Sequence, residues 1–132
     1  MQTTKQNKII KQIFSIDVAS GGDQVKGAFE VDKNAKKIIG IELSSNRDDL
    51  LYYRGSQIIK INDEEFFPEG YESKKLMSGI NIPSHERYYK LGKIDPGNRK
   101  VEIIYTDSDN ALATFDPYTV ILYVYSLLIE EE

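Results

Sequence analysis

The residues of this chain with potential for chemistry are one histidine and three groups of acidic side chains. His85 is the single histidine of the sequence. Carboxylates gather at Asp48-Asp49, at Asp63-Glu64-Glu65 and in the segment Asp107-Ser108-Asp109-Asn110. These residue types serve acid–base catalysis or metal binding. Whether the sequence indicates catalysis or metal binding therefore depends on which other residues stand at the required spacing from them.

The spacing favours turns over metal sites. The segment from Asp107 to Asn110 begins like a calcium loop, but an EF-hand then needs a glycine and a glutamate at its twelfth position. Here the twelfth position is Tyr118, so we interpret the segment as a hairpin turn. The chain has no cysteine, which excludes thiolate metal sites, thiol nucleophiles and disulfides. We expect no bound metal and no cofactor.

No catalytic arrangement is recognisable either. The nucleophile elbow Gly-x-Ser-x-Gly does not occur, and a lone histidine such as His85 in a polar turn is usually a surface residue. Carboxylates about 5 to 10 Å apart in a cleft would suit glycoside hydrolysis, but acidic turns are too common to indicate one. Gly21-Gly22 lacks the lysine and the helix of a phosphate-binding loop. The chain is predicted not to be an enzyme.

Aromatic residues gather in the middle third of the chain. They are Tyr52, Tyr53, Phe66, Phe67, Tyr71, Tyr88 and Tyr89, in a protein with nine Tyr and no Trp. Tyrosine joins a large apolar body to a polar tip and is enriched where proteins meet. Two interpretations stay open: the seven side chains form the core and its rim, or they form an interface. A sugar-stacking platform is a third interpretation, weakened by the missing Trp.

The elements that must position these residues are strands. The chain has 17 Ile, 6 Val, 9 Tyr and 5 Phe against 5 Ala and 9 Leu, and β-branched and aromatic side chains favour strands over helices. Alternating apolar residues predict strands at 10–18, 25–31, 39–43, 50–54, 57–62, 65–68, 101–105 and 118–128. The last of these is apolar on both faces, which predicts a central strand covered on both sides.

The turns between the strands indicate the architecture. Residues 9–44 are predicted to form a three-stranded meander, and residues 44–49 a polar loop with room for one helical turn. Pro68 cannot donate a hydrogen bond to a neighbouring strand, so the strand that ends there is predicted to lie at an edge or to stop there. About eight antiparallel strands without a long helix favour an all-β, single-domain β-sandwich, jelly-roll-like, or a small barrel. We expect a polar N-terminal arm at residues 1–8 and one sandwich domain at residues 9–132.

The stretch 69–98 is predicted to be irregular, with a short helix at 85–89 capped by Ser84. Loops of this length in compact domains are often functional surfaces. Residues 69–98 and the N-terminal arm are therefore the places where we expect contacts with other proteins.

Charge and composition restrict the partners. A net charge of −4, from 17 basic and 21 acidic residues, argues against a nucleic-acid binder, which usually gathers a basic excess on one face. The N-terminal residues are polar, so no signal peptide is expected. The longest apolar stretch, 119–129, is about half of a membrane span, so we expect no direct membrane insertion. The lack of cysteine and of Asn-x-Ser/Thr acceptors suits a reducing cytoplasm.

The layout of the whole chain resembles a known family. Its length of 132 residues, its eight or so strands and its short polar arm are similar to the single jelly-roll vertex (penton) and minor capsid proteins of tailless icosahedral bacteriophages. The stretches NRDDLLYYRG (46–55) and FFPEGY (66–71) also resemble phage virion proteins. The resemblance rests on length and layout, and it carries no functional residue across.

The resemblance implies a non-enzymatic structural virion protein that forms a symmetric oligomer, expected to be a pentamer, and contacts a major capsid protein. It implies localisation in the virion after synthesis in the host cytoplasm, and otherwise in the cytoplasm. The alternatives are a carbohydrate- or ligand-binding β-sandwich module, and a small β-barrel accessory or inhibitor protein.

Overall fold

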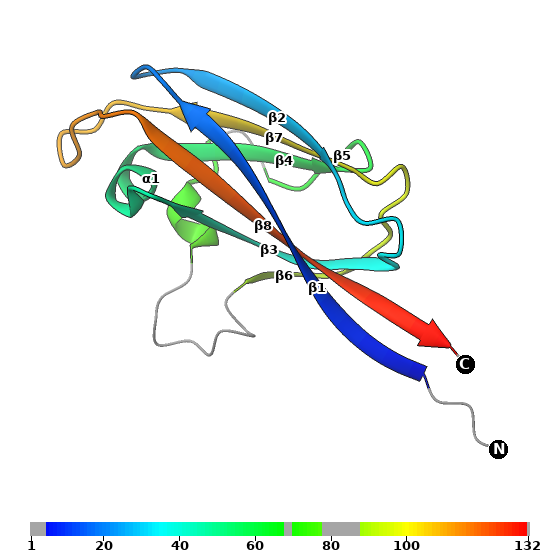
Figure 1. Ribbon diagram of the computed structural model, residues 1–132. Coiled ribbons are helices and arrows are strands. Elements are labelled where there is room, and N and C mark those ends of the chain that lie inside the picture. Colours follow the sequence, from blue (N-terminus) through cyan, green and yellow to red (C-terminus); the bar gives the residue numbers. More distant parts are fainter. Residues whose placement is uncertain (1–4, 68–69, 78–87, 132) are drawn as a thin grey trace.

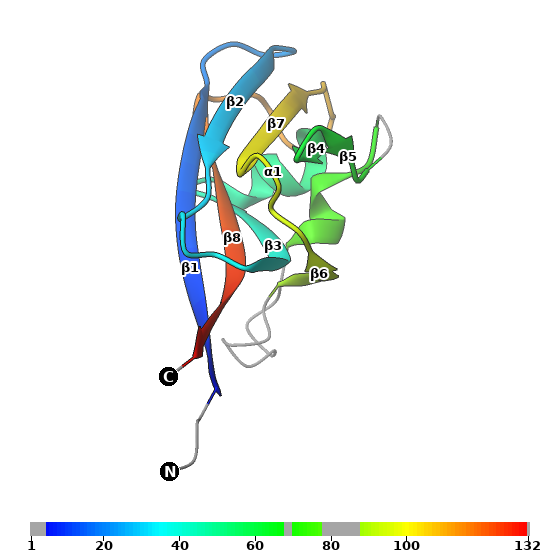
Figure 2. The ribbon, with the colours of Figure 1, turned by 90° about the vertical axis from the view of Figure 1, so that its right-hand side faces the viewer.

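Two four-stranded antiparallel sheets face each other in this protein (Figures 1 and 2). The computed structural model describes residues 5–67, 70–77 and 88–131. The first sheet, here called the β1 sheet, consists of β1 (Lys5–Val18), β8 (Tyr118–Glu131), β3 (Lys37–Ser45) and β6 (Tyr89–Ile94) in that order. The β2 sheet consists of β2 (Gln24–Glu30), β7 (Lys100–Asp107), β4 (Gly55–Ile61) and β5 (Glu64–Glu65). The predicted all-β sandwich is confirmed.

The strand order is that of a jelly roll. β1 pairs with β8, β2 with β7, β3 with β6 and β4 with β5, all antiparallel. This is the pairing of one long hairpin, and the further pairs β3–β8 and β4–β7 roll that hairpin into two sheets. Rolling buries one face of every strand, which is why period-two alternation dominates the sequence.

The core lies between the sheets and is filled by alternate residues of the central strands. Val120, Leu122 and Val124 of β8 are buried, as are Ile103 of β7 and Ile59 of β4. At the side where the edge strands β1 and β2 lie close together, the rings of Phe14 and Phe29 stack with centroids 4.5 Å apart. The alternating apolar residues that predicted these strands therefore form their inner faces.

One predicted strand is wrong, because residues 50–54 belong to helix α1 (Asp48–Arg54). Leu50, Leu51 and Arg54 are buried while Tyr52 and Tyr53 are exposed, which is the spacing of a helical face rather than of a strand. A short apolar run cannot by itself distinguish the two. The acidic first turn and the basic last turn of α1 complement the helix dipole.

The predicted three-stranded meander over residues 9–44 is also wrong. β1 and β3 lie in one sheet with β8 between them, and β2 lies in the other. The turn after Asp32 and the segment after Asp107 therefore connect the two sheets instead of closing hairpins. Alternation along a strand shows which side chains are buried, but it does not show which strand is the neighbour.

The last strand is central, as predicted, but it is not covered on both faces throughout. β8 lies between β1 and β3. On its outer face Tyr125 and Leu127 are buried. Ile121 and Tyr123, on the same face, are half-buried. The first half of this face is thus open among the described residues.

The remaining expectations are met in part. β5 is an edge strand, as predicted, but it covers only Glu64–Glu65 and not the predicted range 65–68. The stretch 69–98 contains the 3-10 helix η1 (Ser73–Leu76), which packs on α1, and the strand β6. The helix expected at 85–89, with His85 and Ser84, lies mostly outside the described residues, and Tyr89 begins β6. β1 begins at Lys5, so the second half of the expected arm is strand.

Candidate functional site

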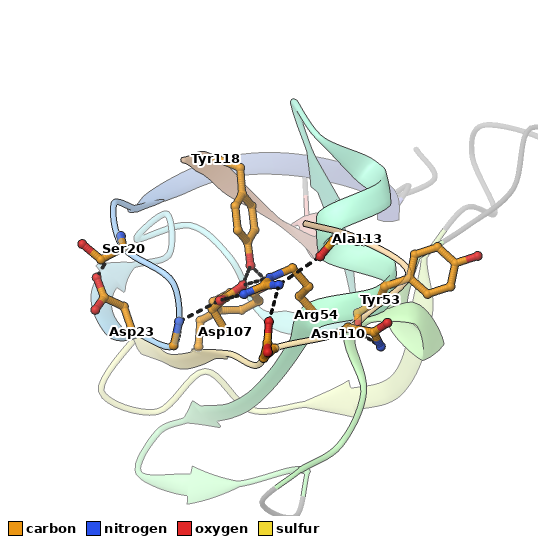
Figure 3. Close-up of polar contacts among 11 residues, drawn as sticks. Ser20, Asp23, Tyr53, Arg54, Asp107, Asn110, Ala113 and Tyr118 are labelled. Carbon is orange, nitrogen blue, oxygen red and sulfur yellow. Dashed lines mark hydrogen bonds and ion pairs between the residues drawn. The ribbon is translucent and has the colours of Figure 1, made fainter. Parts of the chain in front are cut away.

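A buried ion pair lies at the end of the sandwich where α1 is placed (Figure 3). Arg54, in the last turn of α1, donates to both carboxylate oxygens of Asp107 at the end of β7. The distances are 3.0 Å from Nε to Oδ1 and 2.8 Å from Nη2 to Oδ2. Arg54 is 4% and Asp107 is 2% exposed. Two parallel hydrogen bonds of this kind give the strongest arginine–carboxylate geometry.

Further hydrogen bonds complete both groups. The guanidinium donates from Nη1 to the carbonyl oxygen of Ala113 at 2.9 Å and to Asp109 Oδ1 at 3.3 Å. Asp107 accepts from the backbone N–H of Gly22 at 2.9 Å and from the hydroxyl of Tyr118 at 2.6 Å. A buried ion pair is tolerated when its remaining polar atoms are matched in this way. We call these residues the Arg54–Asp107 network.

The network joins segments that are far apart in sequence. It reaches the β1–β2 turn at Gly22, the helix at Arg54, the β7–β8 loop at Ala113 and the start of β8 at Tyr118. Gly22 has φ of +81°, a conformation that a side chain would strain. The backbone N–H of Asp107 also donates to the carbonyl of Asp23 at 2.9 Å. One ion pair thus fixes the loops at this end of both sheets.

Two buried phenols extend the network into the core. The hydroxyls of Tyr118 and Tyr105 lie 2.8 Å apart. Gly55 lies against Tyr105, and a Cβ at this position would overlap the phenol oxygen and Ser73. Ser73 of η1 donates to Gln57 Oε1 at 2.5 Å. The sequence therefore requires a glycine where α1 meets β4.

The protonation states of the network are those of a permanent ion pair. Burial alone would raise the pKa of Asp107, but hydrogen bonds from Arg54, Gly22 and Tyr118 outweigh burial and hold that pKa below its usual range. Burial, together with the hydrogen bond to Asp107, raises the pKa of Tyr118. Neither Asp107 nor Tyr118 exchanges a proton near neutral pH, and the ion pair is shielded from solvent, so the arrangement is suited to holding structure.

Three exposed side chains belong to the segments that the network holds, since Tyr52 and Tyr53 precede Arg54 and Leu112 precedes Ala113, and we call Tyr52, Tyr53 and Leu112 the α1 surface. All three are exposed, Leu112 to 74%. Asn110 holds their backbones together, because its Nδ2 donates to the carbonyl of Tyr53 at 3.0 Å and its Oδ1 accepts from the N–H of Leu112 at 2.8 Å. The rings of Tyr52 and Tyr53 meet edge to face, with centroids 4.9 Å apart.

The structure divides the seven aromatic residues of the sequence prediction into separate groups. Tyr52 and Tyr53 lie on the α1 surface, while Phe67 is buried and packs against Tyr71 and Tyr89. Phe66 is half-buried and packs on the core. Tyr88 stacks on Tyr125, with centroids 4.5 Å apart, on the outer face of the β1 sheet. The seven residues do not form one interface.

Sequence reasoning missed the network itself. Asp107 was predicted to start a hairpin turn and Arg54 to end a strand, so neither was a candidate. One sequence signal for a helix was present. Acidic residues stand in its first turn, at Asp48 and Asp49, and a basic residue stands in its last turn, at Arg54. This signal could have placed Arg54 on the buried face of a helix, together with Leu50 and Leu51. No sequence signal pairs Arg54 with a carboxylate 53 residues later.

The acidic groups predicted to be turns lie apart from one another. Asp49 and Asp116 each pair with Arg47 at 3.0 Å on the surface, and Asp63-Glu64-Glu65 lies exposed at the β4–β5 turn. Within residues 5–67, 70–77 and 88–131, no group of three acidic or histidine side chains is placed to hold a metal ion. In the same part of the chain, no helix is long and apolar enough to cross a membrane.

A shallow groove of about 220 Å³ crosses the outer face of the β2 sheet. Its side chains are mainly uncharged hydrogen-bonding groups, among them Gln24, Ser56 and Thr106, with Ile58 and Ile104 also lining it. Such a lining can bind a neutral polar ligand.

Comparison of the chain with protein-family models, with curated protein sequences and with solved structures gives no match. The jelly-roll assignment therefore rests on strand order alone. The fold is shared by capsid proteins, lectins and cupins, so it does not by itself select a function.

Proposed function

We propose that this chain is a non-enzymatic structural subunit of a virus particle, a jelly-roll block that contacts neighbouring proteins through its α1 surface. The observation that carries the proposal is the combination of exposed Tyr52, Tyr53 and Leu112 with the buried network that holds their segments. Tyrosine is prominent among the side chains that dominate protein–protein binding energy.

Rigidity favours this use of the α1 surface. The backbone of Tyr53 is held by Asn110, the neighbouring Arg54 is fixed by Asp107, and the loop carrying Leu112 is fixed through Ala113. A surface that is already ordered loses little conformational freedom on binding. A subunit that must repeat the same contact in every copy benefits from such preorganisation.

The proposal includes a closed ring, expected to have five copies, and contact with a major capsid protein. A ring needs a head-to-tail interface in which two different surfaces of the subunit meet. The α1 surface would supply one of the two.

Native mass spectrometry and light scattering on the purified full chain test the proposal. We expect a closed oligomer that is weakened by the double change Tyr52→Ala and Tyr53→Ala, with unchanged thermal unfolding because both side chains are exposed. The control is Glu30→Ala, an exposed position on β2. A protein that stays monomeric at every concentration would contradict the proposal.

A carbohydrate-binding module is the second candidate, favoured by the uncharged groove of the β2 sheet. In that case a monomer should bind a glycan on an array, and Thr106→Val together with Gln24→Ala should abolish the binding. If no glycan is retained by the wild-type chain, this candidate is rejected.

A further inference from the structure

An open pocket of about 410 Å³ lies on the outer face of the β1 sheet, where β6 forms the edge beside β3. We call it the β3–β6 pocket. It combines apolar walls with two cations, and its lining residues are Ile39, Tyr88, Lys90, Gly92, Lys93 and Leu127. Sites for small molecules typically have volumes of about 300–1,000 Å³ and few polar groups among apolar walls. The β3–β6 pocket therefore has the size and composition of a small-molecule site.

Irregular strand pairing forms this pocket. The register of β3 shifts between Ile38 and Gly40 against both of its neighbours, so Ile39 is an extra residue without a partner in either ladder. Opposite Ile39, β6 has the three residues 91–93, and Gly92 among them has φ of +83°. Bulges redirect side chains and are frequent beside functional sites. Glycine within a strand often stands where a ligand approaches the backbone closely.

An aromatic ring forms one wall of the pocket. The Tyr88 ring stacks on Tyr125, with centroids 4.5 Å apart and an angle of 24° between the planes. Tyr88 also lies over Gly40, where a Cβ would overlap its ring. Since Tyr125 covers one face of the Tyr88 ring, the other face or the edge borders the pocket. Aromatic rings bind other flat rings in offset-stacked or edge-to-face geometry, so this wall favours a flat apolar ligand.

The charge of the pocket favours an anion. Lys90 and Lys93 are exposed, and neither forms an ion pair with another described residue. Lys37 lies on the same outer face, and its Nζ is 4.0 Å from the exposed carboxylate of Asp95. Glu42 is on this face too, where it accepts a tyrosine hydroxyl at 3.1 Å. Neither of these two carboxylates lines the pocket. Two unpaired cations beside apolar walls attract a negatively charged group.

We propose that the β3–β6 pocket binds a small organic anion, a carboxylate carried on a flat apolar body. The apolar body lies against Tyr88, Ile39 and Leu127. The carboxylate lies between the ammonium groups of Lys90 and Lys93. This binding site goes beyond the structural function proposed above and does not depend on it.

Calorimetric titration of the full chain with cinnamate tests the proposal. Cinnamate is a flat aromatic carboxylate, and cinnamamide is its neutral analogue of nearly the same shape. We expect saturable binding of one cinnamate per chain that weakens as salt is added. Cinnamamide should bind about fivefold or more weakly, because it cannot pair with the two lysines. In nitrogen–proton correlation spectra, the amide signals of residues 90–93 should shift as cinnamate binds.

A pair of double variants separates the pocket from the overall charge of the chain. Lys90→Gln with Lys93→Gln should weaken cinnamate binding about fivefold or more. The matched control is Lys8→Gln with Lys26→Gln, which changes the net charge equally at exposed positions on β1 and β2. The control should leave the affinity unchanged. All four lysines are exposed, so we expect both double variants to fold, and circular dichroism checks this.

The ring is tested by Tyr88→Leu, which keeps an apolar side chain but removes the flat wall. It should weaken binding of cinnamate more than binding of octanoate, a flexible carboxylate. Three results would overturn the proposal: no saturable cinnamate binding up to about 5 mM, equal affinity for cinnamamide, or equal effects of the two double variants. Each would leave the proposed structural function untouched, since that function is read from the oligomeric state.

Discussion

The interior of the α1 end and the outer face of strands β1 and β8, here called the outer β1–β8 face, depart from the usual distribution of polar and apolar groups in opposite ways. At the α1 end an arginine and an aspartate are buried. On the outer β1–β8 face Ile9 and Ile13 are exposed. Buried charges and clustered exposed apolar side chains are the informative exceptions to the general rule.

The two departures differ in where their partners lie. The polar atoms of the Arg54–Asp107 network are matched within the chain, by Gly22, Ala113 and Tyr118. Ile9 and Ile13 of the outer face are 47% and 63% exposed, so the described residues leave them largely uncovered. The first departure therefore concerns how this chain holds its own loops, and the second leaves apolar side chains open to solvent among the described residues.

Breaking the buried pair should have the largest effect on stability. Arg54→Met leaves the Asp107 carboxylate buried without its cation, and we expect the free energy of unfolding to fall by about 3–5 kcal/mol. Urea denaturation followed by circular dichroism measures this loss. The matched control is Arg47→Met, which removes the exposed pairs with Asp49 and Asp116. It should cost much less, because exposed ion pairs contribute little to stability.

Equal losses in the two arginine variants would show that the buried network is no more important than a surface ion pair. The contrast between the α1 interior and the protein surface would then disappear.

Removing one hydroxyl from the network should have a smaller effect. Tyr118→Phe deletes the donor to Asp107, and hydrogen bonds to charged groups contribute about 1.5–3 kcal/mol. Tyr105→Phe deletes a hydroxyl that contacts Tyr118 instead of the carboxylate, so we expect about 1 kcal/mol. Thermal unfolding of both variants provides the comparison, and a larger loss for Tyr105→Phe would contradict this account.

Acid should weaken the α1 interior. The pKa of Asp107 is lower in the folded protein than its usual value, so the unfolded chain binds the proton more readily. The stabilisation is therefore complete above the ordinary pKa of about 4 and is lost as the pH falls through the lower folded value. Urea midpoints measured across this acid range should decline for the wild type. Asp107→Asn should start lower and decline less, and parallel curves would contradict the assignment.

Changes on the outer β1–β8 face should have the smallest effect on stability. Ile13 is 63% exposed, so Ile13→Ser should change the free energy of unfolding of the monomer by about 0.5 kcal/mol or less. Urea denaturation in dilute solution measures this. A loss comparable to that of Arg54→Met would mean that the face belongs to the core.

The strands were largely predictable, since burial of one strand face dictates the alternation of residues such as Val120, Leu122 and Val124. The helix was not, because Leu50 and Leu51 fit a strand as well as a helical face until the rest of the core is in place. The candidate site was predicted only at Tyr52 and Tyr53. Leu112, Arg54 and Asp107 carried no local signal of their role.

The sequence by itself determined the fold class, most of the strands and the central place of the last strand. These follow from side-chain type and period, which are local properties of the chain. Only the tertiary structure decided that β1 pairs with β8 and that Arg54 meets Asp107. These depend on which distant segment supplies the neighbour, and long-range pairing is settled by the packing of the whole core and not by any short stretch of sequence.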